Sequence, residues 1–453
     1  MIRTETTVAA SLMACLTLAG CSINESFVDG FDQDPNLPTD APTEKVFIAG
    51  QVGAIVFHEG YAARIANMWS QHFVTDENQY LTVYNYGVTA QDFDPIWSVA
   101  YVRALANLRV AQIKAAADGG KENLVAVAQI NEALLMGTVA ALFGDVPFQE
   151  AADDHINDPV FEPQIRVYEK VVALLDNAIE ELTNSPRNLS GGVDVYSFAG
   201  RAERWVKAAY TLKARFHMHM SGVDPSNLQR VIDATTLGID EAGGRGDLRI
   251  LHGTVVNEDV NLWSAFTSDR AWLFAEGGHA LTLLNQRNNS KTDESGRINQ
   301  LFVAGLKFPN ITRGAFKPDS PFPLVTFVEN QLLRAEAFAR LGNDADALEA
   351  LNRARAANKT VFGGSYDALS IQDFATGEYA GTTLLQEILD ETYLTYIASI
   401  EAFNFVRRVE YPIVPVTGAR IPQRFLYANT EINANSNAPQ PIPALTDPTP
   451  VNQ

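Results

Sequence analysis

Apolar residues recur at spacings of three and four positions along most of this chain, as they do on the buried face of an amphipathic helix. In YEKVVALLDNAIEEL such a stripe consists of Val171, Leu174, Ala178 and Leu182. The stretches RWVKAAYTLKARFHMHM and LLQEILDETYLTYIASIEAFNFVRR show the same periodicity. Alternation of apolar and polar positions is scarce, and YLTVYNYGV comes nearest to a short strand. The pattern predicts a mostly α protein.

One segment predicts a pair of helices joined by a tight turn. It reads FVENQLLRAEAFARLGNDADALEALNRARAAN, with Gly342 where the first helix would end in the left-handed conformation. The expected apolar face carries Leu333, Ala337, Leu341, Ala345 and Leu348. This arrangement resembles a tetratricopeptide repeat, and GTVAALFGDVPFQEA suggests a second copy. Because a stable array needs three or more copies, other helix pairs should be divergent repeats, and we predict a tetratricopeptide-like helical-repeat scaffold with long irregular insertions.

Two parts of the chain depart from the helical pattern. Residues 238–323 contain the runs EAGGRGD and NQRNNSKTDESGR, and structureless stretches of this length are usually functional or disordered. Beyond Arg408 the chain is rich in proline and asparagine, so this end should either wrap the surface or lack fixed structure. We predict a single helical domain over residues 45–453, with residues 238–323 as its insertion.

The N-terminal sequence predicts export and lipid attachment. Arg3 precedes an apolar run that is too short to span a bilayer. The run ends in LAGC at Cys21, which resembles a bacterial lipobox. Residues 1–20 would then be a lipoprotein signal peptide, and Cys21 would carry the lipid that holds the protein to a membrane. Residues 21–44, rich in Asp, Asn and Pro, are interpreted as a flexible tether. The alternative is an ordinary signal peptide with a chance cysteine.

The net charge of the chain limits the kinds of molecule that it can bind. The chain has 54 acidic and 34 basic residues and a net charge of −20. Such a surface repels nucleic acid, so we expect no nucleic-acid partner. After the signal peptide no segment reaches membrane-spanning length without charges, so the body should lie outside the bilayer on its tether.

Several motifs, in order along the chain, resemble those of the SusD/RagB nutrient-binding outer-membrane lipoproteins. They are the lipobox, MWSQHFVTDENQYLTVYNYGVTAQDFDPIWSVAYVRALANL, ALFGDVPFQEA, EPQIRVYEKVVALLDNAIEEL, RWVKAAYTLKARFHMHM, LLRAEAFARLG, EAFNFVRRVEYP and YANTEINANSN. The resemblance implies a mostly helical protein that is lipid-anchored on the outer face of the outer membrane. It also implies a partner, a SusC-like TonB-dependent β-barrel transporter, on which the protein sits as a hinged lid. The ligand would be an oligosaccharide or a peptide, and the protein would have no catalytic activity.

Capture of a sugar requires aromatic faces beside hydrogen-bonding groups, because sugar rings have apolar C–H faces and a rim of hydroxyls. The candidate ligand-binding residues are Trp69, Tyr80, Tyr84, Asn85, Tyr86, Trp263 and Trp272. Each aromatic residue could instead lie in the core. Our hypothesis is that the two tryptophans of the insertion contact ligand.

The sequence offers little support for catalysis or metal binding. It contains no GxSxG, HExxH or EF-hand motif. Asp153, Asp154 and His155 are adjacent, which does not create the opposed carboxylates of a glycosidase. We therefore expect no cofactor and leave a structural calcium ion open. The competing classes are an exported helical enzyme such as a glycosidase, and a repeat-type protein-interaction scaffold.

The last predicted helix carries three charged residues on one face. Glu401 lies six and seven residues before Arg407 and Arg408, which is about two helical turns. We predict that these residues form an ion-pair network that ties the last helices to the body, in preference to a ligand contact.

Overall fold

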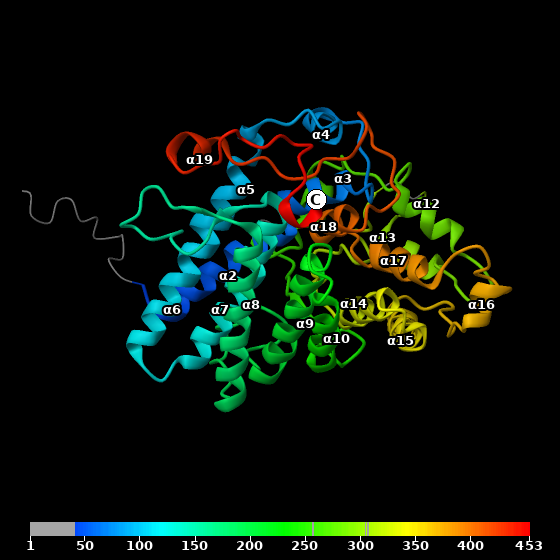
Figure 1. Ribbon diagram of the computed structural model, residues 1–453, viewed down its shortest axis with the longest axis horizontal. Coiled ribbons are helices and arrows are strands. Elements are labelled where there is room, and N and C mark those ends of the chain that lie inside the picture. The colour runs from blue at the N-terminus through cyan, green and yellow to red at the C-terminus, as the bar shows by residue number, and fades with distance from the viewer. Residues whose placement is uncertain (1–40, 256–257, 304, 306–307) are drawn as a thin grey trace, which may run out of the picture. The chain divides into compact units, whose positions relative to one another are not determined.

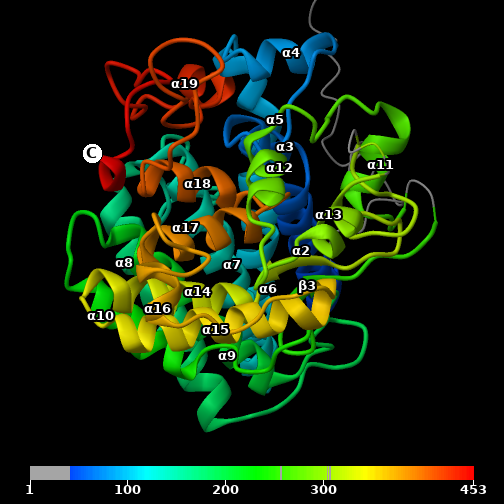
Figure 2. The same cartoon turned by 90° about the vertical axis from the view of Figure 1, so that its right-hand side faces the viewer.

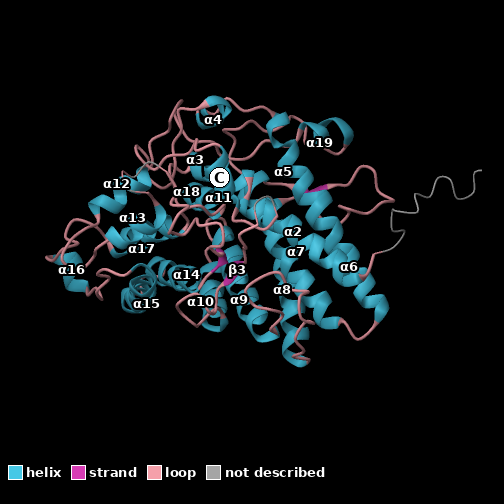
Figure 3. Ribbon diagram, turned by 180° about the vertical axis from the view of Figure 1, so that it is seen from behind, coloured by secondary structure: helices cyan, strands magenta, loops and turns pink. Residues whose placement is uncertain are grey.

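The computed structural model describes residues 41–255, 258–303, 305 and 308–453. The predicted signal peptide, Cys21 and the tether up to residue 40 lie outside these described residues. Residues Thr43–Gln453 form one compact unit. This unit consists of helices joined by loops, with a few two- to four-residue strands (Figure 3). The predicted mostly α class is therefore confirmed.

The α-helices are α2 Thr43–Glu59, α3 Tyr61–Trp69, α4 Asn78–Tyr84, α5 Asp94–Ser98, α6 Ala106–Asp118, α7 Glu122–Phe143, α8 Gln164–Asn184, α9 Ala202–Met220, α10 Asn227–Leu237, α11 Leu262–Asp269, α12 His279–Gln286, α13 Ser295–Leu301, α14 Phe327–Arg340, α15 Asp344–Phe362, α16 Ile371–Ala375, α17 Leu384–Thr395, α18 Glu401–Arg408 and α19 Asn429–Ala434. The 3-10 helices are η2 Ala90–Phe93 and η4 Pro450–Asn452, and η3 Val99–Leu105 is a π-helix. The strands are β1 Val146–Pro147, β2 Phe161–Glu162, β3 Leu248–Ile250 and β4 Phe322–Val325.

The longer helices pack against one another as a series of neighbours. Helix α6 packs on α7, α7 on α8, α8 on α9, α9 on α10, α10 on α14 and α14 on α15. Figure 1 shows this order from the cyan α6 to the yellow α15, and α2 packs on α6 at its beginning. The series contains more helix pairs than the two copies recognised from sequence. The tetratricopeptide-like scaffold is therefore confirmed.

Both predicted turns are present and depend on glycine. Helix α7 is followed by Gly144 at φ +89°, and α14 is followed, after Leu341, by Gly342 at φ +78°. Residues with a Cβ rarely adopt this left-handed conformation. After Gly342 the chain enters α15 at once, whereas after Gly144 it passes through β1 and β2 before α8 begins.

The apolar face predicted for the helix pair α14 and α15 is correct only for its first half. Leu333 and Ala337 are buried, but Leu341 is 50% exposed and Ala345 lies on the surface. The reason is that the turn at Gly342 ends the helical register, so spacing cannot be extended across it. The buried face of α15 consists of Ala347, Ala350, Leu351 and Ala354.

Two helical stretches are long and apolar enough to cross a membrane by length and composition alone. They are Thr43–Trp69, with mean hydropathy 1.2, and Glu122–Phe143, with mean hydropathy 1.5. Their most apolar windows are 61% and 89% buried inside the protein. Both stretches therefore serve as core helices here, and α7 is covered by α6, α8 and α9.

The insertion is anchored to the scaffold at its base by a short antiparallel sheet. Strand β3 pairs with β4, with Leu248 opposite Val325 and Ile250 opposite Phe322. Helices α11, α12 and α13 lie between the two strands in sequence. The stretch YLTVYNYGV, for which we predicted a short strand, forms most of α4 instead. Its buried residues Tyr80 and Val83 are three apart, which suits a helix that covers the core with one face.

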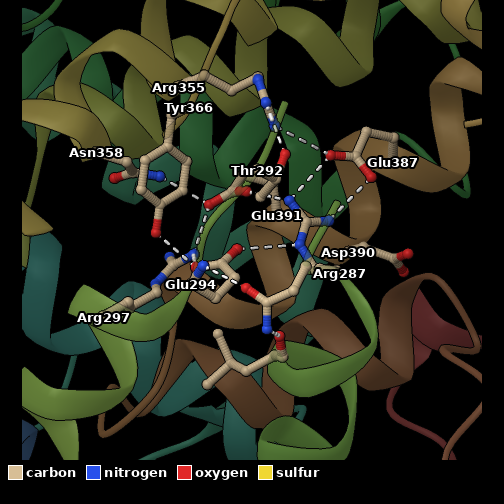
Figure 4. Close-up of polar contacts among 12 residues, drawn as sticks. Arg287, Thr292, Glu294, Arg297, Arg355, Asn358, Tyr366, Glu387, Asp390 and Glu391 are labelled. Carbon is tan, nitrogen blue, oxygen red and sulfur yellow. Dashed lines mark hydrogen bonds and ion pairs between the residues drawn. The ribbon is translucent and has the colours of Figure 1, made fainter. Parts of the chain in front are cut away.

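A buried charge network fastens the insertion to the repeat helices (Figure 4). Its members are Arg287, Arg297 and Arg355 with Glu294, Glu387 and Glu391, none of which is more than 6% exposed. Arg287 donates to both oxygens of Glu387 at 2.9 Å. Glu391 accepts from Arg287 at 2.6 Å and from Arg297 at 2.8 Å. Because α17 carries both of these glutamates, the network links the insertion directly to the C-terminal helices.

The charged residues of α18 tie it to the body, as predicted. Arg408 donates to both oxygens of Glu336 on α14, at 2.6 and 2.7 Å. Glu401 accepts from His219 on α9 at 3.1 Å. Arg407 donates to the backbone carbonyl of Ala141 on α7 at 2.8 Å. Asn404 connects two of these contacts, because it donates to Glu401 and accepts from Arg407.

Candidate functional site

A cleft of about 580 Å³ lies between α2, α3, α4, α5 and α11. Figure 2 shows α3, α4, α5 and α11 in the upper part of the view, above α14 and α15. The aromatic residues Tyr61, Tyr80 and Phe266 line it, together with the aliphatic residues Ile96 and Val99. The cleft therefore combines a segment near the beginning of the domain with the insertion.

Local contacts explain why α11 of the insertion lies at this position. The side chain of Asn261 caps α11, because its Oδ1 accepts from the backbone N–H groups of Trp263 and Ser264, each at 3.0 Å. Glu59, the fully buried last residue of α2, accepts from the Leu262 N–H at 2.8 Å. The end of α2 is thus held to the first turn of α11, which fixes one wall of the cleft.

The aromatic rings of the cleft pack on one another. Tyr80 stacks on Phe266 with centroids 5.0 Å apart and an interplanar angle of 29°. The ring centroid of Trp272 lies 5.5 Å from that of Tyr80, and the ring centroid of Tyr61 lies 6.0 Å from that of Tyr80. Both pairs have steeper interplanar angles than the stacked pair. Tyr61 and Trp272 are half-buried, whereas Tyr80 and Phe266 are nearly covered. Tyr61 therefore presents the largest aromatic surface among the cleft-lining rings.

Hydrogen-bonding groups surround this aromatic wall. Arg64 donates through Nε to the Tyr80 hydroxyl at 2.9 Å, and its guanidinium lies 4.5 Å from the centroid of Phe266. Burial raises the pKa of Tyr80, and the neighbouring Arg64 opposes that shift. The phenol is therefore neutral near pH 7 and remains able to donate a hydrogen bond. Gln79, Asp269 and Arg270 are exposed at the rim and supply both donors and acceptors.

The structure brings two of the predicted residues to this cleft. Tyr80 lines it, and Trp272 supports it through edge contacts with Tyr80 and Phe266. Tyr84 and Tyr86 are half-buried and Asn85 is exposed, and none of these three lines the cleft.

Trp69 and Trp263 are core residues, which corrects our expectation for both. Each is 0% exposed, so neither indole can offer a face to a ligand. Trp69 packs against Phe403 and Phe425 with centroids 5.3 Å away. Trp263 packs 5.1 Å from Phe73. The hypothesis that both insertion tryptophans contact ligand is therefore wrong for Trp263 in this structure.

Most of the residues that line the cleft were not predicted from the sequence. Tyr61 and Arg64 lie one turn apart on α3, and Phe266 and Asp269 lie one turn apart on α11. Both pairs have the three-residue spacing that places side chains on one helix face. An aromatic residue three positions from a polar one could have been found by this criterion, but many other helices contain similar pairs.

The acidic cluster considered for catalysis lies elsewhere and is solvated. Ligand atoms of Asp153, Asp154 and His155 lie within 4.8 Å of one another. The side chains of Asp154 and His155 are 92% and 90% exposed, and their closest atoms are 3.5 Å apart. Groups so exposed lack the low-dielectric surroundings that tune catalytic carboxylates.

Comparison with known proteins shows which sequences and folds this chain is similar to. Residues 36–243 match the SusD-like_2 family model, which is described as "Starch-binding associating with outer membrane". No match to this chain was found among curated proteins.

Solved structures with the same fold include several SusD homologues. A SusD homologue from Parabacteroides distasonis has a TM-score of 0.72 at 17% identity, covering 90% of this chain and 98% of its own. A SusD/RagB family protein from Bacteroides thetaiotaomicron has a TM-score of 0.68 at 21% identity, covering 88% and 95%. A chitin-binding SusD homologue from Flavobacterium johnsoniae has a TM-score of 0.62 at 18% identity, covering 87% and 92%. The resemblance indicated by the sequence motifs is therefore confirmed: residues 36–243 match this family model, and the fold is SusD-like.

Proposed function

We propose that this protein binds an oligosaccharide nutrient in the cleft between α3, α4, α5 and α11. The observation that carries the proposal is the combination of stacked aromatic rings with a polar rim in one open cleft. Sugar rings stack on aromatic faces, and their hydroxyls would be met by Arg64, Gln79 and Arg270. A starch-binding family description and a chitin-binding structural neighbour support a glycan over a peptide.

The lining of the cleft favours binding over hydrolysis. Glycoside hydrolysis normally uses two carboxyl groups on opposite sides of the scissile bond. Among the described residues that line the cleft, Asp269 is the single carboxylate, and it is exposed at the rim. A protein that holds its ligand without cleaving it would need no second carboxylate.

The binding test compares two classes of oligosaccharide by isothermal titration calorimetry. Maltohexaose and N-acetylglucosamine hexamer serve as probes for the purified protein. We expect one of them to bind, and Tyr61→Leu to weaken that binding about fivefold, because it removes an aromatic face worth about 1 kcal/mol while keeping apolar volume. Tyr210→Leu is the matched control, since Tyr210 is a half-buried tyrosine on α9, away from the cleft. Equal effects of the two substitutions would argue against this cleft.

We further propose that the protein acts as a surface lipoprotein, anchored through Cys21, that passes its ligand to a TonB-dependent β-barrel transporter and covers it as a lid. The family description, which includes association with the outer membrane, supports this location. The test is purification of the lipidated protein from detergent-solubilised outer membranes, followed by mass spectrometry. Stoichiometric recovery of a large β-barrel receptor is the expected result. Recovery of the lipoprotein alone, under conditions that keep other complexes intact, would count against the lid role.

An exported glycosidase is the competing class, and product release separates the two. Incubation of the protein with the bound oligosaccharide, followed by chromatography, is expected to return the ligand intact. Shortened products that disappear in an Asp269→Asn variant would place the protein among the enzymes.

A further inference from the structure

A second cleft, of about 770 Å³, lies on the other side of α5. Pro95 lines both clefts, which places them next to each other across this short helix. The floor of the second cleft is apolar and includes Trp97, Tyr101 and Pro147. Trp97 and Tyr101 are mostly covered, at 6% and 9% exposure, so they support the floor more than they project from it.

The helix between the clefts has an unusual backbone. Helix α5 continues into the π-helix η3, which leads into α6. Val99 of η3 lines the first cleft, whereas Tyr101 and Val102 line the second. Val102 is 65% exposed, which is high for a valine. Single π-helical turns inside a longer helix occur frequently at functional sites, and this one presents side chains to both clefts.

Three carboxylates surround the second cleft, and each is oriented by a contact on one oxygen. Asp94 Oδ1 accepts from the Thr430 backbone N–H at 2.9 Å and from its hydroxyl at 3.0 Å. Glu431 Oε1 accepts from the amide of Asn435 at 2.7 Å. Asp153 Oδ1 accepts from the backbone N–H of His155 at 2.9 Å.

The remaining oxygens of these carboxylates are available. Within the described part of the chain, no hydrogen bond or ion pair reaches Oδ2 of Asp94, Oδ2 of Asp153 or Oε2 of Glu431. The described lining contains no lysine or arginine. Arg109, which lies nearby, is occupied by Glu132 at 2.8 Å and by the carbonyl of Phe148 at 2.8 Å. The cleft therefore has hydrogen-bond acceptors and negative charge without an internal cation.

We propose that the second cleft binds amine-bearing sugar units, such as glucosamine, of an oligosaccharide. This inference rests on the proposed function, because it assigns the same ligand class to a neighbouring site. A protonated amino sugar has apolar C–H faces that suit the floor and an ammonium group that donates up to three hydrogen bonds to carboxylates. Because Pro95 borders both clefts, one extended oligomer can occupy both. The first cleft contains Arg64 and Arg270, so it suits the neutral units of such a ligand.

The test compares ligands that differ only in the charge of the nitrogen. Glucosamine hexamer and N-acetylglucosamine hexamer are titrated against the purified full chain at pH 6 and low ionic strength. The double variant Asp153→Asn/Glu431→Gln removes two of the three cleft charges and keeps side-chain size. We expect it to weaken binding of the glucosamine hexamer about three- to tenfold, the range that two partly exposed ion pairs supply. Binding of the acetylated hexamer should not change.

General attraction of a cationic ligand to an acidic protein is controlled by a second double variant. Glu180→Gln/Glu349→Gln removes the same charge from exposed positions on α8 and α15, outside both clefts. An equal loss of affinity in both double variants would overturn the proposal, as would no loss in either. Hexalysine is a further probe, and the same dependence on Asp153 and Glu431 for hexalysine would overturn the sugar assignment in favour of a general ammonium site.

Failure of this inference can be separated from failure of the proposed function. If neutral oligosaccharide binds and depends on Tyr61, while the glucosamine hexamer shows no dependence on Asp153 and Glu431, the second site is refuted and the first stands. If maltohexaose binds but neither the glucosamine hexamer nor the acetylated hexamer does, the second site is likewise refuted and the first stands. If none of the three oligosaccharides binds the wild-type protein, both proposals fail together.

Discussion

Glu391 provides the sharpest test of how the insertion is held to the repeat scaffold. It is fully buried and accepts hydrogen bonds from Arg287, Arg297 and Asn358. Burial alone would raise the pKa of Glu391, but Arg297 and Arg287 more than offset this and lower it from 4.5 to about 2. At about 1.4 kcal/mol for each pKa unit, the ionised form gains about 3 kcal/mol in the folded state.

We therefore expect Glu391→Gln to lower the free energy of unfolding by about 3 kcal/mol at pH 7. The substitution keeps the shape of the side chain but leaves three buried arginines facing two glutamates. Removing one partner of a buried pair costs about 3–5 kcal/mol in other proteins, which agrees with this value. Urea unfolding followed by circular dichroism would measure the change as a shift in midpoint.

Two comparisons make this result interpretable. Glu349→Gln on α15 is exposed and should change stability by less than about 0.5 kcal/mol. Adding Arg297→Gln to Glu391→Gln should cost less than the sum of the two single changes, because the charges are coupled. A loss below about 1 kcal/mol for Glu391→Gln, or strictly additive effects, would refute the view that this network fastens the insertion.

Three further outcomes are expected. Arg408→Ala should lower the free energy of unfolding by about 3 kcal/mol and leave oligosaccharide affinity unchanged, because it removes the partner of both oxygens of the buried Glu336 and leaves only the more exposed Arg340. Loss of affinity in a stable protein would instead move this arginine to the ligand site. Gly53→Ala should destabilise by about 1–3 kcal/mol in thermal melts, since its Cβ would lie 2.6 Å from the backbone of Arg103, and a neutral effect would mean that α2 and η3 can separate. The contribution of Glu336 and Glu401 to stability should be complete above pH 4.5 and be lost towards pH 2, because their folded-state pKa values are about 2 against an ordinary 4.5; melts without this acid-side loss would contradict the assigned ion pairs.

The aromatic residues in and around the cleft differ in burial in a way that the sequence of one segment does not predict. Tyr80 was identified from sequence because it lies in an aromatic-rich stretch, yet Trp69 and Trp263 carry the same kind of signal and are core residues. The difference arises from contacts between distant segments. Trp69 packs on Phe403 and Phe425, more than 300 residues further along the chain.

The sequence by itself determined the features that depend on local periodicity and local backbone preference. Apolar spacing of three and four residues predicted the helices, and glycine at the left-handed positions of Gly144 and Gly342 predicted both helix-pair turns. These features need only residues within about one helical turn, so they can be read without knowledge of partners.

Only the tertiary structure decided which aromatic residues are covered and where the clefts lie. The first cleft exists because Glu59 at the end of α2 holds the beginning of α11, a contact that spans about 200 residues of sequence. The carboxylates of the second cleft come from α5, the loop after β1 and α19, and no sequence pattern relates these segments. Burial and charge environment are properties of the packed chain, so they become defined only when distant segments meet.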